Sequence, residues 1–341
     1  MKRIITVILS LAASLVVMAQ VRITTPETEL IIKADKGADL QILYFGARLS
    51  DADAANIEAA GVPGHSAYRA YGLWCASEAS LGVTHADGNL STSLKVESVM
   101  QSDVIDNSIV TKVVMKDAVY PFYVTVCYRA YQDVDMIETW TEIANLGKKP
   151  VTLTRFDSGY LPVRVGDVWL SHLHGTWAAE GLLVQEPLQR GMKVIKNKDG
   201  SRNSHTDHAE VMFSLDGKPQ ENTGRVIGAA LCYSGNYELR IDTRDTDYHE
   251  FYAGINPDNS SYKLESKEVF MTPELAFTYS DEGLSGASRN FHKWGRTYKL
   301  AHGDKLRKIL LNSWEGVYFD INEPGMDQMM ADIASMGGEL F

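Results

Sequence analysis

The sequence of 341 residues is poor in cysteine and in basic residues. Its three cysteines, Cys75, Cys127 and Cys232, are too few and too scattered for a disulfide framework or a zinc site. We therefore expect three buried thiols, with one bridge as the alternative. Lys and Arg number 33 against 44 Asp and Glu, for a formal net charge of −11. Because nucleic-acid binding depends on Lys and Arg that displace counterions from phosphates, no nucleic-acid partner is expected.

Internal repeats and low-complexity runs are absent, which excludes a repeat architecture and a compositionally biased chain. The remaining composition is that of a soluble globular protein, with 45% hydrophobic residues and a mean hydropathy of −0.18. A chain of this length can bury one large core or two ordinary ones. Neutral sugars are compatible with such an acidic surface.

The amino terminus has the pattern of a signal peptide. Lys2 and Arg3 precede the apolar stretch Ile4–Met18, and Val17–Ala19 supplies the compact residues that signal peptidase reads. We predict a signal peptide at residues 1–19, cleavage before Gln20 and a periplasmic or secreted protein. The apolar stretch has about 15 residues, short of the roughly 20 that span a bilayer, so no membrane contact is expected after cleavage.

Residues 20–300 have the composition of short antiparallel strands. Four segments are rich in Val, Ile, Thr and aromatic residues and partly alternate: Ser108–Met115, Phe122–Tyr131, Met136–Ile143 and Val151–Phe156. Turn residues such as those at Asn145–Gly147 separate the segments. The pattern predicts a mainly β domain, an antiparallel sandwich, with short helices at Asp51–Ala60 and around Ser285–Lys299.

Residues 301–341 have a different pattern. Ile309–Leu311 is a short apolar run typical of a strand in a parallel sheet, and Glu339–Phe341 would begin a second strand. Between them we expect a helix that Asn322 caps, that Pro324 opens and that Gly337 ends. Its apolar stripe consists of Met326, Met329, Met330, Ile333 and Met336. The pattern predicts the start of a βα-repeat barrel, which needs eight repeats to close, so we expect the chain to be a fragment.

The residues themselves resemble glycoside hydrolase family 36 α-galactosidases. The segment NSWEGVYFDINE at 312–323 is similar to the first barrel strand of that family, which continues into a VLDDGWF-type segment. Upstream, ordered segments also match, strongly from about Tyr237 and weakly before Gly166. They are Gly254–Asn256, Glu268–Glu274, Ala276–Gly283, Ser288–Trp294, His174–Trp177 and Gly200–His205.

The resemblance implies a large β-supersandwich at residues 20–300, followed by the truncated start of a catalytic (β/α)8 barrel at 301–341. It implies an enzyme of the α-galactosidase class that acts on terminal α-galactosides of oligosaccharides by a retaining double displacement. Both catalytic aspartates of the family lie on later barrel strands, so we expect no catalytic residue here and an inactive 341-residue chain. A DDGW-type continuation in the downstream DNA would test this. No cofactor and no metal are expected, and a homo-oligomer is left open.

Two alternatives remain at this point. One is a non-catalytic carbohydrate-binding or assembly module, in which Trp169, Trp177 or Tyr252 would provide stacking platforms. The barrel start at 309–341 argues against it, because a free-standing module would leave those apolar faces without partners. The other is galactosyl transfer of the raffinose-synthase type, which these residues do not distinguish from hydrolysis. The preferred galactoside is also undetermined.

Trp314 is the predicted substrate-binding residue. It follows the first barrel strand, where an indole ring can stack on the C–H face of a pyranose while its N–H remains able to donate. Glu315 is adjacent, but the family resemblance assigns it a structural role at the barrel mouth. Asp320 and Glu323 lie near the start of the helix, where acidic side chains favour the helix dipole.

Weaker expectations concern three residues of the β domain. The resemblance suggests that Asp53, Trp177 and His205 lie in loops near the barrel mouth or at a subunit contact. His172 and His174 share one face of a predicted strand, but nothing in the sequence brings them to the polar loop that holds His205 and His208. A zinc site is therefore not expected. The acidic run Asp242–Glu250 lacks the order of a calcium loop, and we expect a solvated turn between strands.

Overall fold

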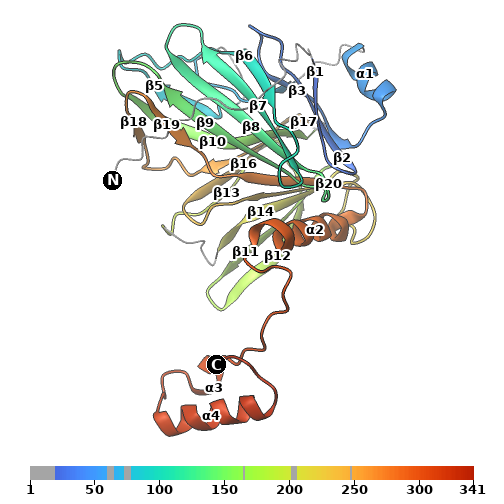
Figure 1. Cartoon of the computed structure of the whole chain (residues 1–341), viewed down its shortest axis with the longest axis vertical. Coiled ribbons are helices and arrows are strands. Elements are labelled where there is room, and N and C mark those ends of the chain that lie inside the picture. The colour runs from blue at the N-terminus through green and yellow to red at the C-terminus, as the bar shows by residue number, and fades with distance from the viewer. Residues whose placement is uncertain (1–19, 60–64, 73–77, 164–165, 201–205, 246–247) are drawn as a thin grey trace. The chain divides into compact units, whose positions relative to one another are not determined.

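Strands rich in β-branched and aromatic residues dominate the first 280 residues, as the sequence predicts (Figure 1). The chain divides into two units, Met1–Phe291 and His292–Phe341, and the boundary predicted after residue 300 stays a prediction. None of the helices among the described residues has the length and apolarity needed to span a bilayer. The computed structural model describes residues 20–59, 65–72, 78–163, 166–200, 206–245 and 248–341.

The largest sheet has ten strands, in the order β12-β11-β14-β15-β20-β9-β8-β7-β6, with β19 also paired to β9. Its strand pairs are antiparallel. The segments expected as strands from 108 to 143 form its β7, β8 and β9. The bounds are β6 Leu94–Gln101, β7 Ser108–Asp117, β8 Phe122–Tyr131, β9 Ile137–Asn145, β11 Trp169–Thr176, β12 Ala179–Pro187, β14 Asp207–Ser214, β15 Val226–Leu231, β19 Glu268–Met271 and β20 Leu275–Ser280.

A six-stranded antiparallel sheet packs against the ten-stranded one. Its order is β13-β16-β17-β10-β18, and β5 also pairs with β10. Phe213 of β14 meets Phe251 of β17 edge to face, with ring centroids 5.2 Å apart, and both rings are fully buried. The interface between the two sheets is therefore the core of a sandwich. The bounds are β5 Leu81–Thr84, β10 Val151–Val163, β13 Gly191–Lys196, β16 Tyr237–Asp245, β17 Tyr248–Ile255 and β18 Tyr262–Leu264.

A four-stranded antiparallel sheet, in the order β1-β2-β3-β4, adds to the sandwich. Phe45 of β3 packs edge to face on Phe277 of β20, with ring centroids 5.1 Å apart. The short helix α1, Asp51–Ala59, follows β3 where the sequence predicts it. Ser50 caps that helix, since its hydroxyl accepts from the Asp53 backbone N–H at 3.2 Å. The bounds are β1 Gln20–Thr24, β2 Thr28–Lys33, β3 Gln41–Ala47 and β4 His65–Ser66.

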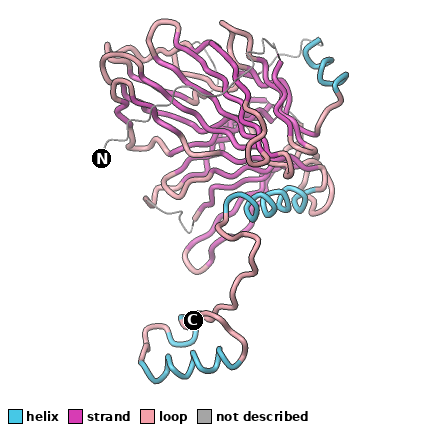
Figure 2. The backbone as a smooth tube through the Cα atoms, viewed as in Figure 1, coloured by secondary structure: helices cyan, strands magenta, loops and turns pink. Residues whose placement is uncertain are grey.

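Helix α2, Gly283–Trp294, lies against the ten-stranded sheet (Figure 2). Gly228 of β15 permits this contact, because a Cβ there would come within 2.8 Å of the Phe291 ring. Gly283 opens the helix with a φ of 66°, which glycine adopts without strain. The helix continues into a π-helical turn, η1, Gly295–Lys299.

The second unit contains helices α3, Trp314–Val317, and α4, Glu323–Ser335. The predicted cap of α4 is confirmed, because the Gly325 N–H donates to Asn322 Oδ1 at 3.0 Å. Leu310 and Leu340 form a parallel β-bridge on either side of that helix, as in a β-α-β unit. None of residues 301–341 is buried, so this unit has no core of its own within the described residues.

Two expectations from the sequence are wrong. The run 242–250 was expected to be a solvated turn, but its described residues lie in the paired strands β16 and β17, and Glu250 is fully buried. Glu250 Oε1 accepts a hydrogen bond from the Tyr160 hydroxyl at 3.0 Å and forms an ion pair with Arg69 at 2.9 Å. The thiols were expected to be buried, but Cys232 is exposed, whereas Cys127 is buried and Cys75 lies outside the described residues.

Candidate functional site

The backbone around Ile309 places the candidate site at the end of a parallel strand pair. The Glu339 N–H donates to the Ile309 carbonyl at 2.9 Å, and the Leu311 N–H donates to the Leu340 carbonyl at 3.1 Å. Asn312, Ser313 and Trp314 then follow at the carboxyl end of the first strand. In barrel enzymes this end of the strands holds the chemistry.

Trp314 opens helix α3 with 43% of its surface exposed. The Asn312 side chain fixes the turn before Trp314, because Asn312 Oδ1 accepts a hydrogen bond from the backbone N–H of Trp314 at 2.9 Å. Phe319 meets the indole edge to face at 4.9 Å, and Tyr318 does so at 5.6 Å. Trp314, Tyr318 and Phe319 form what we call the aromatic cluster, and its rings are accessible to a ligand. The prediction that Trp314 binds sugar stays a prediction.

Sequence reasoning missed Tyr318 and Phe319. The signal was present, because two aromatic residues follow Trp314 at the fourth and fifth positions, within reach of one helical turn. Tyr318 ends α3 with a φ of 48°, a left-handed conformation that is uncommon for a bulky residue. This backbone reversal turns both side chains back onto the indole.

The carboxylates near the cluster are exposed and lie on separate elements. Glu315 is in α3, Asp320 is in the loop that follows, and Glu323 is in the first turn of α4. A retaining pair needs two carboxyl groups about 5 to 5.5 Å apart across a bound sugar. These three residues form no buried carboxylate pair, so they provide an acidic rim rather than glycosidase machinery.

Histidines gather at a second place, the β11–β12 hairpin of the first unit. His174 Nδ1 lies 2.9 Å from Asp207 Oδ1 of the adjacent β14, a pairing that the sequence did not indicate. His172 Nε2 lies 3.3 Å from Glu186 Oε1, which also pairs with Lys193 at 2.6 Å. Burial and then the charge of Lys193 lower the pKa of His172, so its imidazole stays neutral near pH 7.

The described residues contain no group of three His, Cys, Asp or Glu side chains arranged to hold a metal ion. The two histidines of the hairpin therefore belong to separate hydrogen-bonded pairs. Glu186 and Asp207 hold His172 and His174, respectively, in place on one face of the strand.

The remaining predicted site residues lie apart from one another in the first unit. Asp53 is exposed on α1, and Trp177 is 78% exposed at the turn of the β11–β12 hairpin, at the other end of the sandwich (Figure 1). His205 lies outside the described residues. Of the stacking platforms named for the alternative module, Trp169 is half-buried, and Tyr252 of β17 is completely buried and therefore does not provide one.

Two family models match the chain. The glycosyl hydrolase family 36 N-terminal domain covers residues 38–265, and the melibiase family covers residues 269–341. Among curated proteins, α-galactosidase AgaA of Geobacillus stearothermophilus is 32% identical over 232 residues, which are 67% of this chain and 31% of that protein. α-Galactosidase Mel36A of Lactobacillus acidophilus is 30% identical over 231 residues, again 67% of this chain and 31% of that protein.

Solved structures share the fold over nearly the whole chain. The galactosidase domain of the α-galactosidase–sucrose kinase AgaSK aligns with a TM-score of 0.86 at 22% identity, over 96% of this chain and 50% of that one. AgaA of Geobacillus stearothermophilus aligns with a TM-score of 0.83 at 23% identity, over 94% of this chain and 49% of that one. Variants of AgaA were solved in complex with stachyose and with raffinose. This chain therefore spans about a third of the curated relatives and half of the solved chains.

Proposed function

The chain belongs to glycosyl hydrolase family 36, and from this membership we propose that it is the amino-terminal sandwich and first barrel segment of an α-galactosidase. The main support for the proposal is that the two family models match the chain one after the other, from residue 38 to residue 341. The parallel bridge between Leu310 and Leu340 supports it, because it has the strand arrangement of a barrel start.

The proposed substrates of the whole protein are oligosaccharides with terminal α-galactosyl residues. Support comes from the names of the curated relatives and from the stachyose and raffinose complexes of AgaA. The aromatic cluster fits this class, since an exposed indole suits the C–H face of galactose. Trp314 would contribute to positioning the galactosyl ring and would take no part in proton transfer.

We propose that the 341-residue chain alone does not hydrolyse galactosides. Hydrolysis with retention needs a nucleophilic carboxylate and a second carboxyl group that acts as acid and base. The carboxylates around the aromatic cluster are exposed and lie on separate elements, so they do not create that environment. The test is an assay of the purified chain with an aryl α-galactoside and with raffinose. Release of nitrophenol or galactose above the level of a boiled sample would contradict the proposal.

We also propose that the protein is exported by cleavage of residues 1–19. Lys2, Arg3 and the apolar stretch Ile4–Met18 support it, since they have the order of a signal peptide. Amino-terminal sequencing of the exported protein is expected to start at Gln20. A protein that retains Met1 would overturn this proposal and leave the family assignment untouched.

We also propose that the β domain associates with a second copy of itself. The β11–β12 hairpin exposes Trp177, Leu182 and Leu183 by 78%, 58% and 61%, an unusual amount of apolar surface for one hairpin. Light scattering after size exclusion is expected to show an oligomer, and Leu182→Lys with Leu183→Lys is expected to shift it toward the monomer. A monomer at all concentrations would contradict it.

A further inference from the structure

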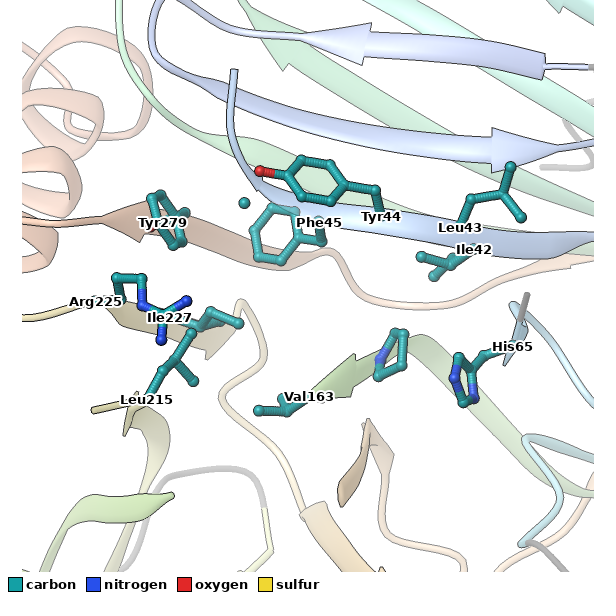
Figure 3. A pocket seen from close by; sticks show the side chains of 12 residues that line it. Ile42, Leu43, Tyr44, Phe45, His65, Val163, Leu215, Arg225, Ile227 and Tyr279 are labelled. Atoms are coloured by element: carbon teal, nitrogen blue, oxygen red, sulfur yellow. The ribbon is translucent and has the colours of Figure 1, made fainter. Parts of the chain in front are cut away.

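A cavity of about 230 Å³ lies in the first unit, between the four-stranded sheet and the two larger sheets (Figure 3). Strand β3 contributes one wall through Ile42 and Phe45. The opposite wall consists of Val163 at the end of β10, Ile227 of β15 and Leu215, which follows β14. The cavity belongs to the β domain alone and is built separately from the aromatic cluster.

The apolar walls of the cavity are held by packing. Phe45 is fixed by its edge-to-face contact with Phe277, and Ile42, Val163 and Ile227 are each at most 3% exposed. Gly46 lets the Tyr44 ring lie close to the strand, because a Cβ at residue 46 would come within 2.7 Å of the Tyr44 hydroxyl. The cavity is therefore part of the fold rather than a gap between loose side chains.

Polar groups converge at one end of this cavity. Arg225, Tyr44 and Tyr279 meet there, whereas His65 lies at the other end (Figure 3). Arg225 Nε donates to Asp216 Oδ1 at 2.9 Å, which leaves its Nη1 without a hydrogen bond to any described residue. The Tyr279 hydroxyl likewise makes no hydrogen bond within the described chain. Two donors are thus available to a ligand.

The end of the cavity at Arg225 carries no net charge. Asp216 neutralises Arg225, and the guanidinium holds the pKa of the Asp216 carboxyl below its usual range. Burial raises the pKa of Tyr44 to about 12 and also raises that of Tyr279, so both phenols are neutral near pH 7. The Tyr44 hydroxyl donates to the Ala47 carbonyl at 2.7 Å, so its oxygen remains able to accept. The site offers uncharged hydroxyls and one paired guanidinium.

We propose that this cavity binds a single pyranose ring of a neutral sugar, at a site separate from the barrel. An apolar wall suits the C–H face of the ring, while donors and an acceptor at one end suit its hydroxyl groups. The volume is below the roughly 300–1,000 Å³ of pockets for drug-sized ligands, so it fits one ring rather than an oligosaccharide. The paired guanidinium favours a neutral sugar over a sugar acid.

The test is saturation-transfer NMR and calorimetry on the purified 341-residue chain with methyl α-galactopyranoside and methyl α-glucopyranoside. Leu215→Trp fills the cavity and is expected to weaken binding at least tenfold. Tyr279→Phe removes one donor and is expected to weaken it about fivefold. Tyr123→Phe, which removes a phenol from β8 away from the cavity, is the matched control and is expected to bind like the original chain.

Four outcomes would overturn the proposal. They are the absence of saturation transfer from both glycosides, unchanged binding in Leu215→Trp and Tyr279→Phe with native circular dichroism, tighter binding of galacturonate than of the methyl glycosides, and loss of binding in Trp314→Ala alone. The last outcome would assign the sugar to the aromatic cluster and would support the proposed function. Binding that survives Trp314→Ala and fails in Tyr279→Phe supports the cavity independently of that function.

Discussion

Asp157 and Arg240 form an ion pair in which each side chain is only 3% exposed. Arg240 also contacts Glu78 at 2.9 Å and Glu238 at 3.2 Å, so one guanidinium of β16 holds three carboxylates. Removing one partner from such a buried group leaves the others without compensation. These residues therefore influence stability more strongly than the exposed ion pairs of the surface.

Asp157 is expected to make stability depend on pH. Burial raises the pKa of this carboxyl from 3.8 to about 6, although Arg240 and Arg155 oppose the shift. The folded state then binds the proton more tightly than the unfolded state. The contribution of Asp157 to the free energy of unfolding is therefore largest below about pH 4. It decreases by about 3 kcal/mol as the pH rises to 6 and is constant above pH 6.

Urea unfolding from pH 4 to pH 7 tests this effect as a difference between proteins. The stability of Asp157→Asn relative to the unchanged chain should vary with pH between 4 and 6 and be constant above 6. Asp39→Asn, a change in an exposed ion pair, is the control and should show no such step. A pH-independent difference for Asp157→Asn would contradict the prediction.

Trp314→Ala is expected to reduce kcat/KM roughly fivefold in the whole protein, because stacking of an aromatic ring contributes about 1 kcal/mol beyond area burial. Steady-state kinetics with an aryl α-galactoside measure the change. Trp314→Phe keeps a ring and should recover part of the loss. An unchanged kcat/KM in Trp314→Ala would remove the indole from the list of sugar contacts.

At the scale of elements, helix α2 depends on a glycine in the strand beneath it. Gly228 lies in β15, where its missing side chain makes room for the Phe291 ring of α2 and for Thr278 of β20. Helix α4 depends instead on its own residues, since Asn322 caps it and Gly337 ends it. One helix is thus placed by tertiary packing and the other by local sequence.

Gly228→Val is expected to destabilise the first unit by about 1–3 kcal/mol, because added carbons must push the Phe291 ring off the sheet. Thermal and urea unfolding, followed by circular dichroism, measure the loss. Gly166→Ala is the matched control, since a Cβ there meets no atom within 4 Å. Equal stability of both variants would show that the contact between α2 and β15 is loose.

At the scale of the whole molecule, the two units differ in how they bury apolar residues. The first unit has one large core shared by its sheets. From residue 301 onward no residue is buried, and Leu306, Phe319 and Met336 are 98%, 86% and 81% exposed. Because helices gain most of their stability from packing, the first unit is expected to be far more stable than the second.

Limited trypsin digestion should therefore cut the chain first at Lys305, Arg307 or Lys308, which are all exposed. The expected product is a resistant fragment that begins near Gln20 and keeps the β signal in circular dichroism. Mass spectrometry identifies the cut. Initial cleavage inside the strands of the sandwich, or resistance of the whole chain, would show that the first unit is not more stable than the second.

Much of the candidate site could be predicted from local sequence, but its partners could not. Asn312, Trp314 and the cap of α4 follow from short motifs, as do strands β7 and β8. The pairing of His174 with Asp207 spans 33 residues and depends on the register between β11 and β14. Glu250 was expected to be exposed, because a run of charged residues normally faces water unless another segment of the chain supplies partners for it.

By itself the sequence determined the class of the protein, its strands and the parallel arrangement of its last segment, since these depend on residue patterns within about 10 to 30 positions. Only the tertiary structure decided which polar groups are buried, which histidines are paired and where the cavity beside Arg225 lies. The physical reason is that burial and pairing depend on strands that are distant in the chain and adjacent in the sheets.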